Sequence, residues 1–145
     1  MDVSLDVFYT GQFVLPLPEG HRFPMAKYHM LRDRLAAEQP GVRLNTASPA
    51  SDGVLALAHT PDYIRELSTG SIAPAAMREI GFPWSEAMVA RARLSVGATI
   101  DACRAAFKQG LAANIAGGTH HSYAHKGSGF CVFNDYAEAA RLMQD

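Results

Sequence analysis

Residues 111–135 read LAANIAGGTHHSYAHKGSGFCVFND, and the fold class can be inferred by starting from this stretch. It begins with a largely apolar run, 111–116, that is continuous rather than alternating. Such a run of strand length is typical of a strand covered on both faces, as in a parallel sheet. Gly117 and Gly118 end the strand, and a loop rich in His, Ser and Gly continues to Asn134. In open α/β sheets, functional groups gather beyond the carboxyl ends of the strands, so this loop is the first candidate for a site.

Strand and helix patterns alternate in the residues that precede this stretch. Strands are predicted at residues 5–9 and 42–45. Apolar residues recur at helical spacing from Met25 to Leu35 and again over 84–108, which predicts two helices. This alternation indicates an α/β fold with a parallel sheet.

Shorter elements are predicted between and after these. A short helix is predicted over 54–58, and Thr60 followed by Pro61 is typical of a helix start. Residues 68–83 carry glycine and proline breaks and are expected to be irregular. Asp135 is expected to cap a last helix near the end of the sequence.

The composition fits one globular domain and excludes several classes of protein. Of 145 residues, 48% are apolar and 19% are charged. Thirteen Lys and Arg against 14 Asp and Glu give a net charge of −1, so no basic excess is present to neutralise nucleic-acid phosphates. No apolar run approaches the ~20 residues of a membrane-spanning helix. We therefore expect neither a direct nucleic-acid partner nor a membrane partner.

The cysteines and the first residues bear on the compartment. Cys103 and Cys131 are the two cysteines, too few for a disulfide framework. Residues 1–6 contain two acids and neither Lys nor Arg, unlike a secretory signal peptide. These features predict a reduced, cytoplasmic protein.

The densest polar group is the tandem pair His120 and His121. The imidazole pKa lies near neutrality, which suits acid–base catalysis, and two adjacent rings cannot both be cationic without cost. One ring is then neutral and ready to accept a proton. Three other interpretations stay open: a solvated surface loop, metal ligation by the pair, and phosphate binding at the two glycines. Against the last two, the loop lacks the further ligands of a zinc site and the GxGxxG pattern of a phosphate loop.

A second group, Gly129, Phe130 and Cys131, follows in the same loop. The glycine allows a bent backbone that would hold Phe130 over a cavity, although Phe130 and its neighbours also fit a core. Cys131 is expected to be a small buried hydrophobic residue rather than a nucleophile. Near the start of the chain, Arg22 lies in a loop that enters a helix, where a solvated helix entrance explains it equally well.

Four segments together resemble a known family. HRFPMAKY at 21–28, AHTPDYI at 58–64, GFPWSEAM at 81–88 and the segment GGTHHSYAHKGSGFCVFND at 117–135 occur in this order. They resemble the zinc-dependent histone deacetylase family, and most closely its class IV and bacterial branch, which includes acetoin-utilisation proteins. The last segment is the most specific, because a double glycine, two histidines, GFC and ND at this spacing are hard to reach by chance.

The resemblance implies an arginase/deacetylase-like fold, a three-layer α/β/α domain on a long parallel sheet. Residues 1–145 would be the N-terminal part of that single domain, which is incomplete in this chain. The resemblance further implies that His121 is the general base that activates a zinc-bound water. His120 would be its partner, which stabilises the developing oxyanion.

The resemblance also assigns residues that bind substrate. Gly129, Phe130 and Cys131 match the wall of a tunnel that grips the stem of an acylated lysine. By a weaker correspondence, Arg22 falls near an arginine that lines an interior product channel.

The metal half of the site is expected outside these residues. The resemblance places the zinc ligands, two aspartates and a histidine, after Asp145, so no residue of this chain is expected to ligate zinc. The full-length protein is expected to hydrolyse acetyl-lysine or a related acetylated amine, and this chain alone is expected to be inactive. A non-catalytic interaction or structural module that keeps the first half of the fold is the rival expectation. An unpaired strand edge at 111–116 would also favour homo-oligomers.

Overall fold

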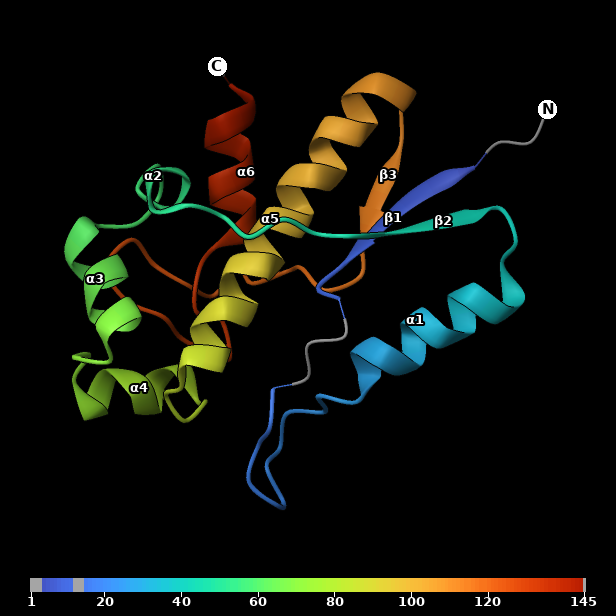
Figure 1. The fold of residues 1–145 in the computed structure, drawn as a ribbon. Helices are drawn as coiled ribbons and strands as arrows, with labels where there is room; N and C mark the ends of the chain where they lie inside the picture. The colour runs from blue at the N-terminus through green and yellow to red at the C-terminus, as the bar shows by residue number, and fades with distance from the viewer. Residues whose placement is uncertain (1–3, 12–14, 145) are drawn as a thin grey trace.

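The computed structural model describes residues 4–11 and 15–144, and three parallel strands organise them (Figure 1). β1 (Leu5–Tyr9) is central, with β2 (Val42–Thr46) on one side and β3 (Ala112–Asn114) on the other. All pairings are parallel. The parallel sheet predicted from the alternation of elements is confirmed.

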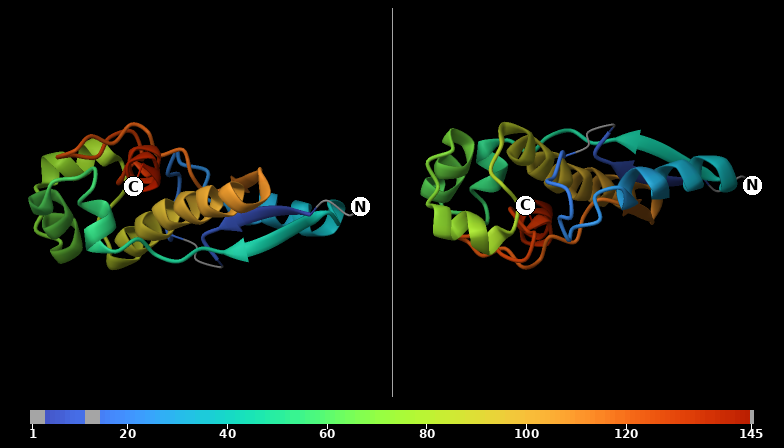
Figure 2. Two further views of the ribbon diagram at one scale, coloured as in Figure 1. Left: turned by 90° about the horizontal axis from the view of Figure 1, so that it is seen from above. Right: turned by 90° about the horizontal axis from the view of Figure 1, so that it is seen from below.

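Helices cover both faces of this sheet. Val7 at the centre pairs with Leu44 on one side and Ala113 on the other. The first crossover leads from β1 to β2, and the second returns past β1 to β3, so the strand order reverses. Because parallel crossovers are right-handed, helices of opposite crossovers lie on opposite faces. α1 (Lys27–Glu38) and α5 (Glu86–Gln109) take these positions, and Figure 2 shows the resulting three layers.

Three short helices form a lobe beside the sheet. α2 (Asp52–Leu55), α3 (Pro61–Thr69) and α4 (Pro74–Ile80) gather around the first half of α5, with α6 (Asp135–Met143) alongside (Figure 1). Side-chain oxygens cap several of these helices, as the sequence predicts for Thr60, which accepts the Tyr63 N–H.

α4 corrects one prediction. Residues 68–83 were expected to be irregular, but they contain a two-turn helix. Pro74 occupies the first helical turn, where its missing N–H is not needed, and Gly81 ends the helix in a left-handed conformation. The proline and the glycine are therefore the boundaries of a helix rather than breaks in a loop.

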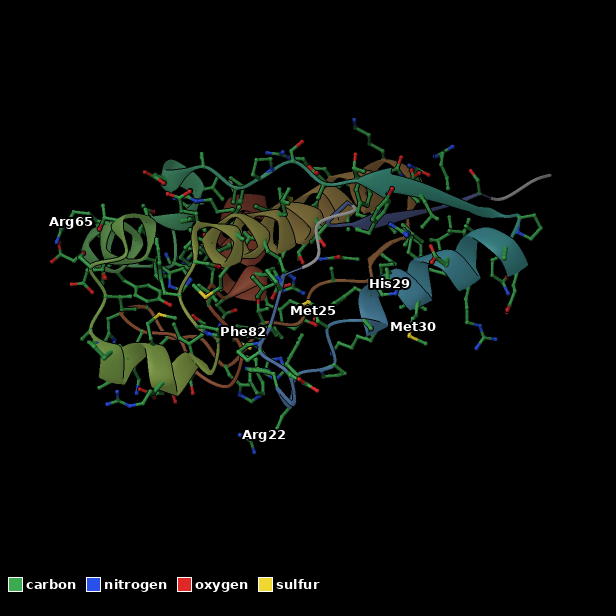
Figure 3. All side chains as sticks on the ribbon, turned by 60° about the horizontal axis from the view of Figure 1, so that its bottom comes forward. Arg22, Met25, His29, Met30, Arg65 and Phe82 are labelled. Carbon is green, nitrogen blue, oxygen red and sulfur yellow. The ribbon has the colours of Figure 1, made fainter. Side chains whose placement is uncertain are left out.

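The hydrophobic core lies in the helical lobe rather than beneath the whole sheet. Its most deeply buried apolar side chains, each at most 2% exposed, are Leu55, Tyr63, Leu67, Ile80, Met88, Val96 and Phe133. By contrast, α1 buries no residue, and Met30 on its outer side is 58% exposed (Figure 3). Within residues 4–11 and 15–144, no helix is both long and apolar enough to cross a membrane.

β3 is shorter and more exposed than the sequence predicts. A strand over 111–116, covered on both faces, was expected, whereas three residues pair with β1 and all three are half-buried. Leu111 just before the strand is 68% exposed. In the described part of the chain, no strand pairs with the outer edge of β3, so the apolar run lacks the cover that its composition suits.

Candidate active site at the carboxyl end of β3

The loop with the tandem histidines leaves the carboxyl end of β3, at the edge of the sheet where the sequence places it. The start of the loop is tied to α5. Ser95 donates from Oγ to the Ala116 carbonyl at 2.6 Å, and the Asn114 side chain accepts the Ala116 N–H at 2.8 Å. These bonds set the direction in which the two glycines leave the sheet.

Asp135 holds the next turn of the loop. Its fully buried carboxylate accepts the N–H of Gly118 and of Thr119, each at 2.9 Å. It also accepts the Thr119 hydroxyl at 3.0 Å and the hydroxyl of Thr99 on α5 at 2.6 Å. The sequence predicts Asp135 as the cap of α6, but Asn134 is the cap and accepts the Ala137 N–H. The carboxylate is directed at the loop instead, because hydroxyl and amide donors from two elements converge there.

His120 and His121 lie side by side on this anchored loop. Their ring centroids are 4.3 Å apart, with the planes inclined by 47°. Both residues are exposed, and the His120 ring stacks nearly parallel to Tyr136 of α6, at 6.2 Å. The pair therefore brings two imidazoles, side chains that can both donate and accept hydrogen bonds, to the same end of the sheet.

The second predicted group adjoins the pair. A Cβ at Gly129 would lie 3.5 Å from the ring of His121, so this backbone packs against the imidazole. Phe130 has a φ of 65°, a left-handed conformation that is uncommon for an aromatic residue. The backbone N–H groups of Gly129 and Phe130 donate to the carbonyls of Glu79 and Ile80 at the end of α4, at 3.2 and 2.7 Å. The helix end therefore holds the strained turn in place.

An aromatic cluster supports Phe130. Its ring centroid lies 5.2 Å from both Phe23 and Phe82 and 5.9 Å from His21. Gly81 lies beneath this ring, and a Cβ there would come within 2.8 Å of it. Phe130 is half-buried, so its ring packs in this cluster and stays partly exposed.

Two other predicted residues, Cys131 and Arg22, and the nearby His125 differ in their surroundings. Cys131 is buried, and burial raises the pKa of its thiol, which leaves it protonated and unreactive near neutral pH. Arg22 is exposed and points away from the body of the protein, so the structure does not bring it to the histidines (Figure 3). His125 is exposed on the loop.

Two buried ionisable residues beside the site were not singled out from the sequence. His59 is 4% exposed and contacts the loop from behind. Arg91 of α5 is 8% exposed, stacks 4.6 Å from the Tyr28 ring, and has one guanidinium nitrogen without a partner among the described residues. It lines a cavity of about 10 Å³ with Thr119 and Phe130, room for about one water. Their burial depends on packing between distant elements, which leaves no local signal.

Potential metal ligands are scattered rather than clustered. Between residues 4 and 144, outside 12–14, no group of three or more His, Cys, Asp or Glu side chains is placed to hold a metal ion. Among the described residues, the tandem histidines therefore have no ligand set of a zinc site around them.

Residues 21–145 match the model of the histone deacetylase domain. The chain belongs to the histone deacetylase family. Its deacetylase domain has a three-layer α/β/α fold, as the sequence resemblance implied, and related solved structures share it. An HDAC homologue from Aquifex aeolicus superposes with a TM-score of 0.74 at 26% identity, covering 97% of this chain and 41% of the homologue.

Other proteins are similar to this chain over different shares of their own length. An uncharacterised protein of Picosynechococcus is 43% identical over 98% of this chain and 48% of its own length. The acetoin utilization protein AcuC of Bacillus subtilis is 38% identical over 66% of this chain and 27% of its own. The HD domain of HDA15 shares the fold alone, with a TM-score of 0.77 at 16% identity. This chain of the histone deacetylase family thus spans less than half the length of the curated relatives that it matches.

Proposed function

We propose that this chain supplies the acid–base pair and one substrate wall of a zinc-dependent deacetylase, which hydrolyses the amide of acetyl-lysine or a related acetylated amine. The observation that carries the proposal is the pair of imidazoles 4.3 Å apart, anchored by Asp135 beside Gly129 and Phe130. Membership of the histone deacetylase family supports the same reaction class.

The zinc of the proposed enzyme is not held by these residues alone, because the described residues contain no set of ligands that fits the ion. The relatives are longer than this chain, and the proposal assigns the ligands to that additional length. The chemistry assigned to this chain is therefore that of its own side chains and not that of the metal.

The histidines perform the proton transfers of amide hydrolysis in this proposal. His121 accepts a proton from the attacking water, and the imidazolium so formed can return it to the leaving amine. His120 stays beside it, and its N–H stabilises the oxyanion that develops on the carbonyl oxygen. Phe130, with Gly129 and Cys131 fixing its backbone, packs against the alkyl stem of the acylated side chain.

The proposed setting follows from charge and cysteine chemistry. Two free cysteines, one of them buried, fit the reduced cytoplasm. A net charge of −1 leaves the acetylated substrate, rather than nucleic acid, as the proposed partner. Through the open edge of β3, other copies of this chain are a second proposed partner.

The test is a deacetylation assay on the full-length protein that contains this chain. His121→Ala is expected to lower kcat by about 10²–10⁴-fold, because its proton acceptor is lost. His120→Ala is also expected to lower kcat severely, because the N–H that stabilises the oxyanion is lost. Phe130→Ala is expected to weaken substrate binding by about 1–3 kcal/mol, with a smaller effect on kcat.

His125→Ala is the matched control, because His125 lies exposed on the same loop. It is expected to leave turnover unchanged. Full turnover by His121→Ala, together with a loss in His125→Ala, would show that the catalytic assignment is wrong. A folded full-length protein that deacetylates no acetylated amine would favour the non-catalytic module.

A further inference from the structure

A buried histidine joins the two ends of the segment that carries Gly129 and Phe130. His59 lies between α2 and α3, and its Nδ1 is 3.3 Å from the Ala124 carbonyl oxygen. Its Nε2 accepts the backbone N–H of Asn134 at 3.0 Å. The next residue, Thr60, also donates its N–H to the Ala124 carbonyl, at 2.9 Å. One imidazole ring therefore spans the loop from Ala124 to the cap of α6.

Asn134 connects His59 with the loop that carries the tandem histidines. Its backbone is held by His59, while its side-chain amide donates to the carbonyl of Ser122 at 3.0 Å and reaches that of His120 at 3.5 Å. The same side chain also caps α6. A shift of Asn134 would therefore move the backbone on both sides of His121.

The contacts require one protonation state of His59. Nε2 accepts an N–H and so carries no proton, which places the ring proton on Nδ1, directed at Ala124. A cationic ring would have to give up the bond from Asn134. Burial lowers the pKa of His59, which favours the neutral ring near neutral pH.

The groups that face the ring from the described part of the chain agree with this neutral state. Glu138 of α6 lies 3.7 Å from Nε2, and neither of its oxygens has a hydrogen-bond partner among the described residues. Burial raises the pKa of Glu138 to about 8, so its carboxyl is neutral at pH 7. The neighbouring rings are Tyr63 at 5.5 Å, whose hydroxyl donates to the Val132 carbonyl, and Phe133 at 5.3 Å.

We propose that His59 is a positioning residue of the deacetylase site: its neutral ring fixes Asn134 and Ala124, and thereby the loop that holds His120 and His121. The inference rests on the proposed function for its catalytic consequence. The contact between His59 and the loop belongs to this chain and can be tested without turnover.

The first test is NMR on the 145-residue chain. The His59 ring is expected to show the neutral Nδ1–H tautomer across pH 6–8, and the Asn134 amide is expected to exchange slowly. In His59→Phe, which keeps the volume but lacks an acceptor, that amide is expected to exchange at least about 10-fold faster, as for the loss of a hydrogen bond worth about 1.4 kcal/mol. The ring-to-ring contact between His120 and His121 is expected to weaken. His59→Gln, which offers an oxygen to Asn134, is expected to restore part of both signals.

The matched control is Tyr63→Phe, which removes a hydrogen bond to Val132 from the same buried cluster. It is expected to lower stability without changing Asn134 exchange. In the full-length enzyme, His59→Phe is expected to lower kcat by up to about 100-fold, with KM changed much less, and His59→Gln to recover part of it. Tyr63→Phe is expected to keep kcat.

The outcomes separate the two proposals. A charged His59 ring at pH 7, or unchanged Asn134 exchange in a folded His59→Phe chain, would overturn the positioning role whatever the enzyme does. Faster exchange with unchanged kcat would overturn its catalytic consequence. If the wild-type full-length protein shows no deacetylation, the proposed function fails, and the NMR result still decides whether His59 fixes the loop.

Discussion

Asp135 accepts four hydrogen bonds on a fully buried side chain, two of them from backbone N–H groups of the histidine loop. Asp135→Asn would replace one carboxylate oxygen with an NH₂ group, which would face the N–H and O–H groups that now donate to the carboxylate. We expect it to lower the free energy of unfolding by about 2–4 kcal/mol, measured by urea denaturation at pH 7. Asp62→Asn is the control, because the Asp62 side chain is 77% exposed, and it should change stability by less than ~0.5 kcal/mol. Equal stability of the two variants would contradict the anchoring role.

Glu138 predicts an unusual dependence of stability on pH. Its pKa rises from an ordinary 4.5 to about 8, because burial disfavours the charged carboxylate. Between these values the folded chain keeps a proton that the unfolded chain has released. The protonated Glu138 therefore contributes fully to the free energy of unfolding below pH 4.5. This contribution is lost as the pH rises to 8, and the free energy of unfolding falls by up to about 1.4 kcal/mol per pH unit.

Glu138→Gln removes this titration. Between about pH 7 and 8, above the ordinary histidine pKa of 6.5, the variant is expected to show a flatter profile in urea denaturation than the wild type. Glu79→Gln is the control, since Glu79 is exposed and paired with Lys126, and its profile should follow the wild type. A profile for Glu138→Gln as steep as that of the wild type would show that another group is responsible.

Among the helices and strands, α5 passes very close to the chain that follows β2. A Cβ at Gly97 would lie 1.6 Å from the Ser48 carbonyl oxygen, a distance that no side chain can occupy. Glycine in a helix interior ordinarily costs about 1 kcal/mol relative to alanine, so alanine here would be favourable in an isolated helix. The close approach explains why glycine stands in the longest helix of the fold.

Gly97→Ala is therefore expected to destabilise the chain by about 3 kcal/mol or more, through displacement of α5 from the backbone at Ser48. Thermal unfolding followed by circular dichroism is the measurement. Gly53→Ala in α2 is the matched control, because the nearest atom to its Cβ would lie 3.8 Å away. It should be neutral or slightly stabilising, and a similar loss in both variants would exclude the steric explanation.

Across the molecule as a whole, apolar surface is left open on the side of β3. Leu111 is 68% exposed and Phe107 is 76% exposed, and both flank the turn that leads from α5 into β3. An unpaired strand edge beside apolar side chains is a template for association.

We expect the 145-residue chain to self-associate as its concentration rises, measured by size-exclusion chromatography with light scattering. Leu111→Lys is expected to shift the distribution toward monomer. Gln39→Lys adds the same charge at an exposed polar position and should leave the distribution unchanged. A wild-type chain that stays monomeric at high concentration would show that the edge is protected.

Much of the fold could be predicted from the sequence where neighbouring residues determine the conformation. The strand at 5–9 and the start of α3 at Thr60 and Pro61 agree with the structure. A short apolar run and a helix cap are each determined by a few neighbouring residues. The sequence does not predict α4, because a proline and a glycine are as common in loops as at helix boundaries. Among the site residues, the structure places the two histidines side by side and Gly129 against the His121 ring, and their catalytic roles stay predictions.

The family, the parallel α/β class and the loop with the tandem histidines follow from the amino-acid sequence, because they depend on the order and spacing of residues along the chain. Three features of the site required the folded structure: Asn134 rather than Asp135 caps α6, Arg91 rather than Arg22 is buried near the site, and His59 lies behind the loop. Burial and hydrogen-bond partners come from elements far apart in the sequence, and a local pattern carries no record of them.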